Sequence, residues 1–126
     1  MILLVDDNQE LLGQLSEFLS AYYIIRPFRS AEQALAFAIE NRGLIEVSVV
    51  DYVMPGMNGE ELARELRKVD PNMMVIMMSG YVDFERIEPL LKERLIYRFY
   101  TKPINFEQLQ RGIDTAAKLY LKKQAI

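Results

Sequence analysis

Five residues with side chains suited to phosphate or metal chemistry each stand at the end of a short apolar run. Two carboxylates, Asp6 and Asp7, follow the first run, and Asp51 ends a later β-branched run. Ser79 ends a methionine-rich run, and Lys102 follows an aromatic one. Burying a carboxylate without a partner costs several kcal/mol or forces it to become neutral. We therefore expect Asp51 either to pair with a cation or to react.

The residue types in this group predict phosphoryl transfer. Three neighbouring carboxylates repel one another unless a cation lies among them. Because the chain has no cysteine and no histidine, an ion with oxygen ligands is expected. Mg²⁺ fits, because it takes one or two carboxylates, keeps waters and bridges to phosphate. A lysine ammonium and a serine hydroxyl suit phosphoryl oxygens. The set predicts in-line transfer onto Asp51, giving an aspartyl phosphate.

Each of these residues alone is weaker evidence than the group. Asp6-Asp7 is also typical of a solvated helix start, Ser79 of a turn, and Lys102 of surface charge. The carboxyl ends of parallel strands meet at one edge of a sheet, where open α/β folds bind their ligands. Convergence at that edge favours the chemical interpretation.

Five apolar runs alternate with amphipathic segments, which predicts parallel strands joined by right-handed helical crossovers. The expected fold is a flavodoxin-like, doubly wound α/β sandwich with five helices and a parallel sheet of order 2-1-3-4-5. Residues 1–126 are expected to form one domain. A proline near its end places the second strand at a sheet edge. The expected strands are 1–5, 23–28, 47–51, 73–78 and 96–100.

Apolar residues at helical spacing and capping residues predict the helices. Ser30 with Gln33, and Asn105 with Gln108, predict capping boxes. The residues expected to face inward are Leu11, Leu12, Leu15, Phe18, Leu19 and Tyr22, then Ala34, Leu35, Ala38 and Ile39, then Leu62, Leu66 and Val69, then Ile87, Leu90, Leu91 and Leu95, and finally Phe106, Leu109, Ile113, Ala116 and Tyr120.

The fourth helix contains Pro89. Proline fits the first turn of a helix but costs about 3 kcal/mol or more deeper inside. We therefore expect regular helix only from about Glu88 onward, with residues 81–87 looser or kinked and Asp83 as a candidate cap.

The composition argues against several classes of protein. The lack of cysteine excludes a disulfide framework, and the lack of histidine excludes imidazole nucleophiles and the usual zinc sites. A net charge of −3 argues against direct nucleic-acid binding. No apolar stretch approaches the roughly 20 residues that cross a bilayer, and no signal peptide precedes the first strand. A cytoplasmic protein without a membrane partner is expected.

The motifs resemble those of receiver domains of bacterial two-component response regulators, in segments 4–8, 51–59, 79–80 and 101–103. The resemblance covers essentially the whole chain. It implies that Asp51 accepts a phosphoryl group from a phosphohistidine on a sensor histidine kinase or phosphotransfer protein. It also implies a signalling protein that catalyses only its own phosphorylation and dephosphorylation. The absence of histidine agrees with a donor on another protein.

The resemblance also implies a ligand set for Mg²⁺. Asp7 would bind the ion directly and Asp6 chiefly through water, with Asp51 and the main-chain oxygen of Val53 completing the protein ligands.

Ser79 and Lys102 would hold the phosphoryl group. Receiver domains couple the serine to an aromatic residue three positions before the lysine, which is Phe99 here in place of the common tyrosine. Phosphorylation would draw Ser79 inward and let Phe99 rotate. The surface of the fourth helix, fifth strand and fifth helix would then signal to an output domain or downstream protein, or form a homodimer.

The lifetime of the aspartyl phosphate can also be predicted. Val53 and Tyr81, two residues beyond Asp51 and Ser79, would flank the path of the attacking water. Neither side chain is a carboxylate or amide that could orient this water. Slow self-dephosphorylation is expected.

Other functions fit less well. An interaction module that is not phosphorylated would usually have lost one of the site residues. A haloacid-dehalogenase-type phosphatase needs an acid where Val53 stands, and a flavin phosphate would be repelled by Asp6 and Asp7. A P-loop enzyme needs a Gly-rich Lys-Ser/Thr motif, which is absent. Segment 96–103 weakly resembles receivers attached to cyclic-dinucleotide or other signalling output domains.

Overall fold

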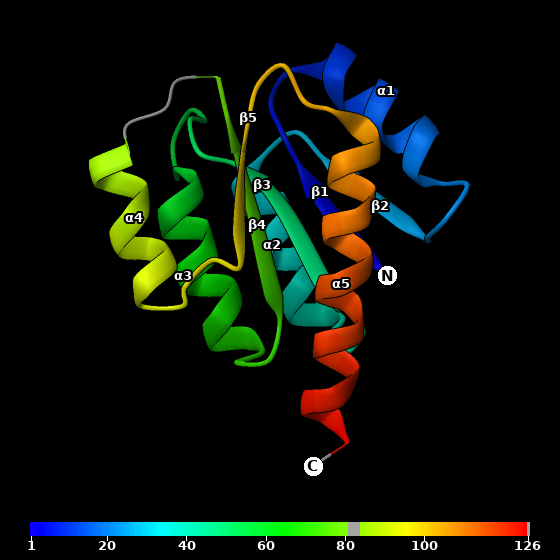
Figure 1. The fold of residues 1–126 in the computed structure, drawn as a ribbon, viewed down its shortest axis with the longest axis vertical. Helices are drawn as coiled ribbons and strands as arrows, with labels where there is room; N and C mark the ends of the chain where they lie inside the picture. Colours follow the sequence, from blue (N-terminus) through cyan, green and yellow to red (C-terminus); the bar gives the residue numbers. More distant parts are fainter. Residues whose placement is uncertain (81–83, 126) are drawn as a thin grey trace.

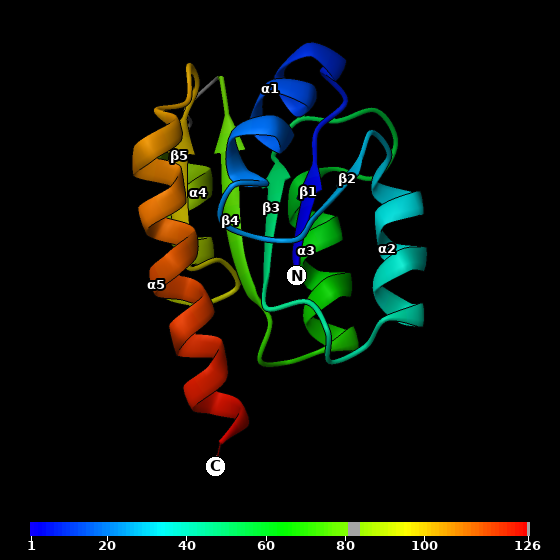
Figure 2. The same ribbon diagram turned by 90° about the vertical axis from the view of Figure 1, so that its right-hand side faces the viewer.

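The computed structural model describes residues 1–80 and 84–125. It contains one five-stranded parallel sheet of order β2-β1-β3-β4-β5, covered by helices on both faces (Figure 1, Figure 2). The flavodoxin-like, doubly wound fold and its strand order are therefore confirmed. The elements are β1 (Ile2–Val5), α1 (Gln9–Leu19), β2 (Ile25–Phe28), α2 (Ala31–Glu40), β3 (Val47–Asp51), α3 (Gly59–Val69), β4 (Met74–Ser79), α4 (Phe84–Lys92), β5 (Arg98–Thr101) and α5 (Phe106–Gln124).

The core consists of two apolar layers, one on each face of the sheet. Leu3 and Val5 of β1 point to the layer that α2, α3 and α4 cover. Ile2 and Leu4 point to the opposite layer, which α1 and α5 cover. Burial on both faces explains why the strands are continuously apolar instead of alternating. None of the described helices combines the length and apolar character needed to cross a membrane.

The register of the sheet aligns the carboxyl ends of its central strands. Val5 pairs with Val50, and Asp51 pairs with Met78. The residues that follow β1 and β4 therefore emerge beside Asp51. Edge strand β2 carries Pro27, as expected for a residue that cannot donate to a neighbouring strand.

The predicted start of the fourth helix was wrong. Helix α4 runs from Phe84 to Lys92 with Pro89 inside it, so residues 84–87 are helical. Pro89 removes the hydrogen bond to the Glu85 carbonyl, but both residues are exposed and water can replace that bond. Burial of Ile87 and Leu90 supports the helix. The expected cap Asp83 and the residue Tyr81 lie outside the described residues.

Two residues expected to face inward are exposed. Helix α1 ends at Leu19, where a turn follows and the N–H groups of Tyr22 and Tyr23 both donate to the Leu19 carbonyl, so Tyr22 leaves the buried face. Its exposed fraction is 55%. The buried face of α2 is formed by Ala31, Ala34 and Ala38. Ile39 lies about 100° around the helix from Ala38, away from this face, and is 52% exposed.

Strand β5 starts two residues later than expected. The N–H groups of Leu95 and Ile96 donate to the Leu90 carbonyl and close the end of α4, so neither joins the sheet. Leu95 is buried, as expected, but lies beyond the helix. Pairing of the chain with β4 begins at Tyr97, whose N–H donates to Val75.

Capping follows the predicted pattern in part. Ser30 and Asn105 accept the N–H of Gln33 and Gln108, but neither glutamine returns a bond. The reciprocal capping box lies instead on α3, between Asn58 and Glu61. Its Asn-x-x-Glu pattern was visible in the sequence.

Candidate functional site

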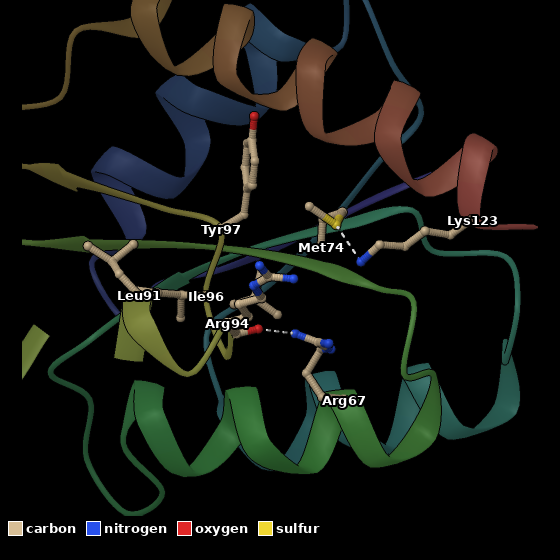
Figure 3. A pocket seen from close by; sticks show the side chains of 8 residues that line it. Arg67, Met74, Leu91, Arg94, Ile96, Tyr97 and Lys123 are labelled. Carbon is tan, nitrogen blue, oxygen red and sulfur yellow. Dashed lines mark hydrogen bonds between the residues drawn. The ribbon is translucent and has the colours of Figure 1, made fainter. Parts of the chain in front are cut away.

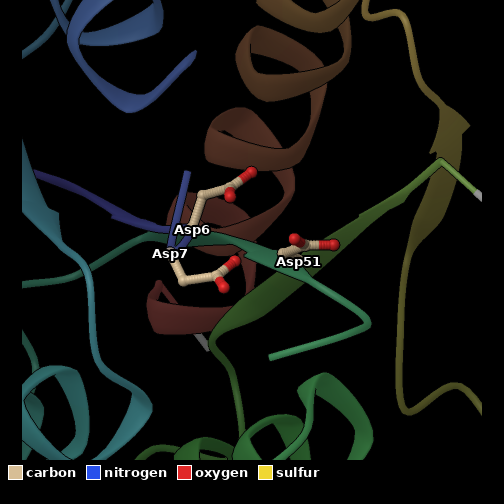
Figure 4. A group of neighbouring side chains, drawn as sticks. All are labelled: Asp6, Asp7 and Asp51. Carbon is tan, nitrogen blue, oxygen red and sulfur yellow. The ribbon is translucent and has the colours of Figure 1, made fainter. Parts of the chain in front are cut away.

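The carboxyl edge of the sheet brings together the acidic residues predicted from the sequence. Asp6 and Asp7 follow β1, and Asp51 ends the neighbouring strand β3 (Figure 4). Each contributes a carboxylate oxygen, and these oxygens all lie within 4.8 Å of one another. Asp6 is completely buried and Asp51 is 5% exposed. This spacing suits a shared cation.

Lys102 reaches the same cluster from the loop after β5. Its ammonium lies 2.9 Å from Oδ2 of Asp6 and 3.1 Å from Oδ2 of Asp51. Lys102 follows β5 closely, and its N–H donates to the Ser79 carbonyl at 2.8 Å, which fixes the start of the loop against β4. The peptide bond to Pro103 is cis. The lysine therefore links the ends of β1, β3 and β4.

The remaining oxygens of the two buried carboxylates accept backbone N–H groups. Oδ1 of Asp6 accepts the N–H of Asn8 at 2.8 Å, and Oδ1 of Asp51 accepts that of Val53 at 3.4 Å. Asn8 also caps α1. Both oxygens of Asp6 are thus engaged, and so are both oxygens of Asp51.

The site raises the pKa values of Asp51 and Lys102. Burial and the neighbouring Asp6 carboxylate raise the pKa of Asp51, against the opposing effect of Lys102. Burial disfavours the Lys102 ammonium, but the hydrogen bond to Asp6 and the charge of Asp51 raise its pKa overall. An extra cation at the cluster would stabilise the ionised carboxylates.

Ser79 and Phe99 occupy the predicted places on β4 and β5. Ser79 is the last residue of β4 and is completely buried. Phe99 is half-buried and packs against the core layer of α2, α3 and α4. It also lines a surface hollow together with Ile87 and Leu91 of α4. Phe99 therefore lies between the core and the surface.

Two backbone features of the site were not recognised in the sequence. A Cβ on Gly59 would lie 2.4 Å from the Asp51 carbonyl oxygen, so helix α3 starts in direct contact with the end of β3. Gly56 has a φ of 75°, and the N–H of Met57 donates to Glu32. A glycine at the first position of a helix was the available signal for the close contact.

We expect Asp51→Asn to stabilise the protein in the absence of metal at neutral pH. A carboxyl whose pKa is raised by folding stabilises the fold below its unfolded pKa, and this stability is lost as pH rises through the folded pKa. The amide removes that loss. The melting temperature of the variant should exceed that of wild type at pH 7, and the difference should shrink as the pH falls toward about 4. A melting-temperature difference that is the same at pH 7 and at about pH 4 would contradict a raised pKa of Asp51.

A doubly wound sheet with an acidic cluster and a bridging lysine at its carboxyl edge defines the receiver-like class of α/β domains. The sequence matches the response regulator receiver domain family over residues 2–114. The chain therefore belongs to the receiver domain family of two-component response regulators.

Individual relatives agree with this assignment. The chain is 34% identical over 126 residues to the sensor kinase CckA of Brucella abortus, covering 98% of this chain and 13% of the kinase. A solved structure described as an adenylate cyclase from Rhodopirellula baltica has a TM-score of 0.92 at 31% identity, covering 98% of this chain and 91% of that one. A receiver domain from Clostridium thermocellum gives 0.89 at 27% identity, covering 99% and 98%. The chain spans 13%, 21% and 31% of three of the curated relatives.

Proposed function

We propose that Asp51 accepts a phosphoryl group from a phosphohistidine on a sensor histidine kinase or phosphotransfer protein. The observation that carries the proposal is the Lys102 ammonium bridging Asp6 and Asp51, with Asp7 beside them. A carboxylate oxygen of Asp51 attacks phosphorus, the phosphorus–nitrogen bond to the donor imidazole breaks, and an aspartyl phosphate forms.

The surrounding residues hold the transferred group. Lys102 and the hydroxyl of Ser79 are assigned to its oxygens, because a point charge and a hydroxyl donor match a phosphoryl group. The carboxylates of Asp6, Asp7 and Asp51 fit Mg²⁺, with the Val53 main-chain oxygen as a further ligand. Bound there, the ion would neutralise charge on the phosphoryl oxygens.

The decisive experiment is intact mass after incubation with acetyl phosphate. Wild type with Mg²⁺ should gain one phosphoryl group, about 80 Da, because the small donor replaces the phosphohistidine. Chelation of the metal with EDTA should abolish the gain, and so should Asp51→Asn, which keeps shape but loses the nucleophile. A gain in the variant would place the acceptor elsewhere. No gain in either protein would favour an interaction module that is not phosphorylated.

We expect the aspartyl phosphate to decay slowly. Val53 is 62% exposed and stands beside Asp51 with no group that can orient water. Val53→Asn should shorten the half-life, measured by the loss of the added mass after the donor is removed. Val53→Ala, which is equally unable to orient water, is the control. A half-life of seconds in wild type would contradict the prediction.

The output side of the proposal involves Ser79 and Phe99. Movement of Ser79 toward the phosphoryl group would let Phe99 reorient and change the surface of α4, β5 and α5. Residues 1–126 would act as one cytoplasmic receiver domain that signals through this surface to an output domain, a downstream protein or a second copy. Sedimentation with and without a phosphoryl mimic measures dimerisation.

A further inference from the structure

A cavity lies at the amino ends of β4 and β5, at the opposite edge of the sheet from the acidic cluster. Figure 3 shows the side chains that line it. It has a volume of about 450 Å³, is partly open to solvent, and lies between the start of β4, the turn before β5 and the ends of α3 and α5. Small-molecule sites have volumes of roughly 300–1,000 Å³. Apolar side chains and one aromatic ring form its walls, namely Met74, Val75, Leu91, Ile96 and Tyr97. The cavity can therefore hold a small organic body.

Three cationic side chains from three elements line the same cavity. They are Arg67 of α3, Arg94 in the turn after α4, and Lys123 near the end of α5. Within residues 1–80 and 84–125, no acidic residue lines it. The whole chain has a net charge of −3, so this is a local reversal of its charge. Converging like charges repel, and a bound anion relieves that repulsion.

Arg67 has a structural role, because its guanidinium binds backbone carbonyls. Its guanidinium donates to the carbonyls of Arg94 at 2.7 Å, Leu95 at 3.2 Å and Pro71 at 3.1 Å. The bonds to Arg94 and Leu95 hold the turn between α4 and β5 in place, and Figure 3 shows the one to the Arg94 carbonyl. Arg67 therefore positions the turn and adds its charge to the cavity.

Arg94 has no such structural explanation. Its φ is 62°, and it is the one non-glycine residue of the described chain with a positive φ. Glycine or asparagine is the usual residue at such a position after a helix. No hydrogen bond or ion pair of its guanidinium exists among the described residues. A conformation that favours glycine is thus occupied by a cation whose charged end is free for a ligand.

Lys123 is also without an anionic partner in the described part of the chain. Its ammonium lies 3.7 Å from the sulfur of Met74, and a thioether is only a weak acceptor. The neighbouring cation Arg94 faces the same space. A ligand oxygen would be a far stronger partner for both groups.

We propose that this cavity binds an organic phosphate monoester. The apolar or aromatic body would pack on Met74, Leu91 and Ile96, and the phosphate dianion would accept hydrogen bonds from Arg94 and Lys123. A guanidinium fork matches two phosphate oxygens at once. The site is distinct from Asp51, since it lies at the amino ends of β4 and β5, and it does not require phosphoryl transfer.

The test is NMR titration of the full chain with phenyl phosphate in EDTA, which keeps metal from the acidic cluster. Saturable shifts are expected at Met74, Leu91, Ile96 and Tyr97. Inorganic phosphate lacks the ring and phenol lacks the charge, so each should bind at least about tenfold more weakly. Equal affinity of inorganic phosphate would overturn the proposal, as would shifts that centre on Asp6 and Asp51.

Two variants separate binding from folding. Arg94→Gly relaxes the backbone at a positive φ and should raise the melting temperature while weakening phenyl phosphate at least about tenfold. Lys123→Ala should also weaken binding, whereas Lys122→Ala, on the same turn of α5 but outside the cavity, should not. Wild-type affinity in Arg94→Gly, or no saturable shift in wild type at millimolar phenyl phosphate, would refute the site.

Discussion

Lys102→Ala is expected to lower the free energy of unfolding by about 2–4 kcal/mol at pH 7 in the absence of metal, and to abolish phosphorylation by acetyl phosphate. Removing one partner of a buried ion pair leaves the other charge uncompensated, at a cost of about 3–5 kcal/mol when burial is complete. The Lys102 side chain retains 21% exposure, so a somewhat smaller loss is expected. Urea unfolding measures it.

Lys118→Ala is the matched control. Its ammonium lies 2.9 Å from Asp114, the same distance that separates Lys102 from Asp6, but the side chain is 73% exposed. Exposed pairs contribute about 0.2–1 kcal/mol. A similar loss in both variants would show that burial of the carboxylates is not the cause.

The pH dependence of the Lys102→Ala variant follows from Asp51. Burial and Asp6 already raise the pKa of Asp51 in wild type, and loss of the lysine should raise it further. Folding then favours protonated Asp51, so the stability of the variant is retained at low pH and lost as the pH rises through that raised pKa. The difference from wild type should therefore be smaller at about pH 4 than at pH 7. Added Mg²⁺ should stabilise the variant more than wild type, because the ion supplies the missing positive charge.

The central site could be predicted from the sequence because the strands themselves determine it. Asp51 ends a strand whose preceding residues are all apolar except Ser48. Such a nearly continuous apolar run is recognisable as a buried parallel strand. Once the strands are parallel, their carboxyl ends must lie together. The proximity of Asp6, Asp51 and Lys102 then follows from topology, without knowledge of any distance.

Features that depend on several elements at once could not be predicted. Tyr22 and Ile39 continue a helical pattern, but the helix end and the alanine stripe that expose them are set by packing. Pro89 is tolerated because it and Glu85, whose carbonyl it leaves unpaired, are both exposed residues. The cavity with Arg94 combines residues from α3, β4, the turn after α4, and α5, and no local pattern joins them.

Gly59→Ala is expected to destabilise the protein by about 3 kcal/mol, since overpacking against rigid atoms forces the backbone to move. The added Cβ would lie 2.4 Å from the Asp51 carbonyl oxygen and 2.7 Å from Cα of Tyr52. Both are backbone atoms, and the Tyr52 N–H and carbonyl are already bonded to Met78 and Gly59. Relief that moves these atoms displaces Asp51 itself, so phosphorylation by acetyl phosphate should fail as well.

Gly13→Ala makes the same chemical change with the opposite expected sign. Gly13 lies on the exposed side of α1, and a Cβ there would meet no atom within 4 Å. Alanine stabilises an exposed helix interior by about 0.5–1 kcal/mol relative to glycine. Urea midpoints of the two variants, measured side by side, separate the effect of the backbone contact at Gly59 from that of helix propensity at Gly13. A Gly59→Ala midpoint near that of wild type would mean that α3 can move away from β3, and that the position of Asp51 does not depend on their contact.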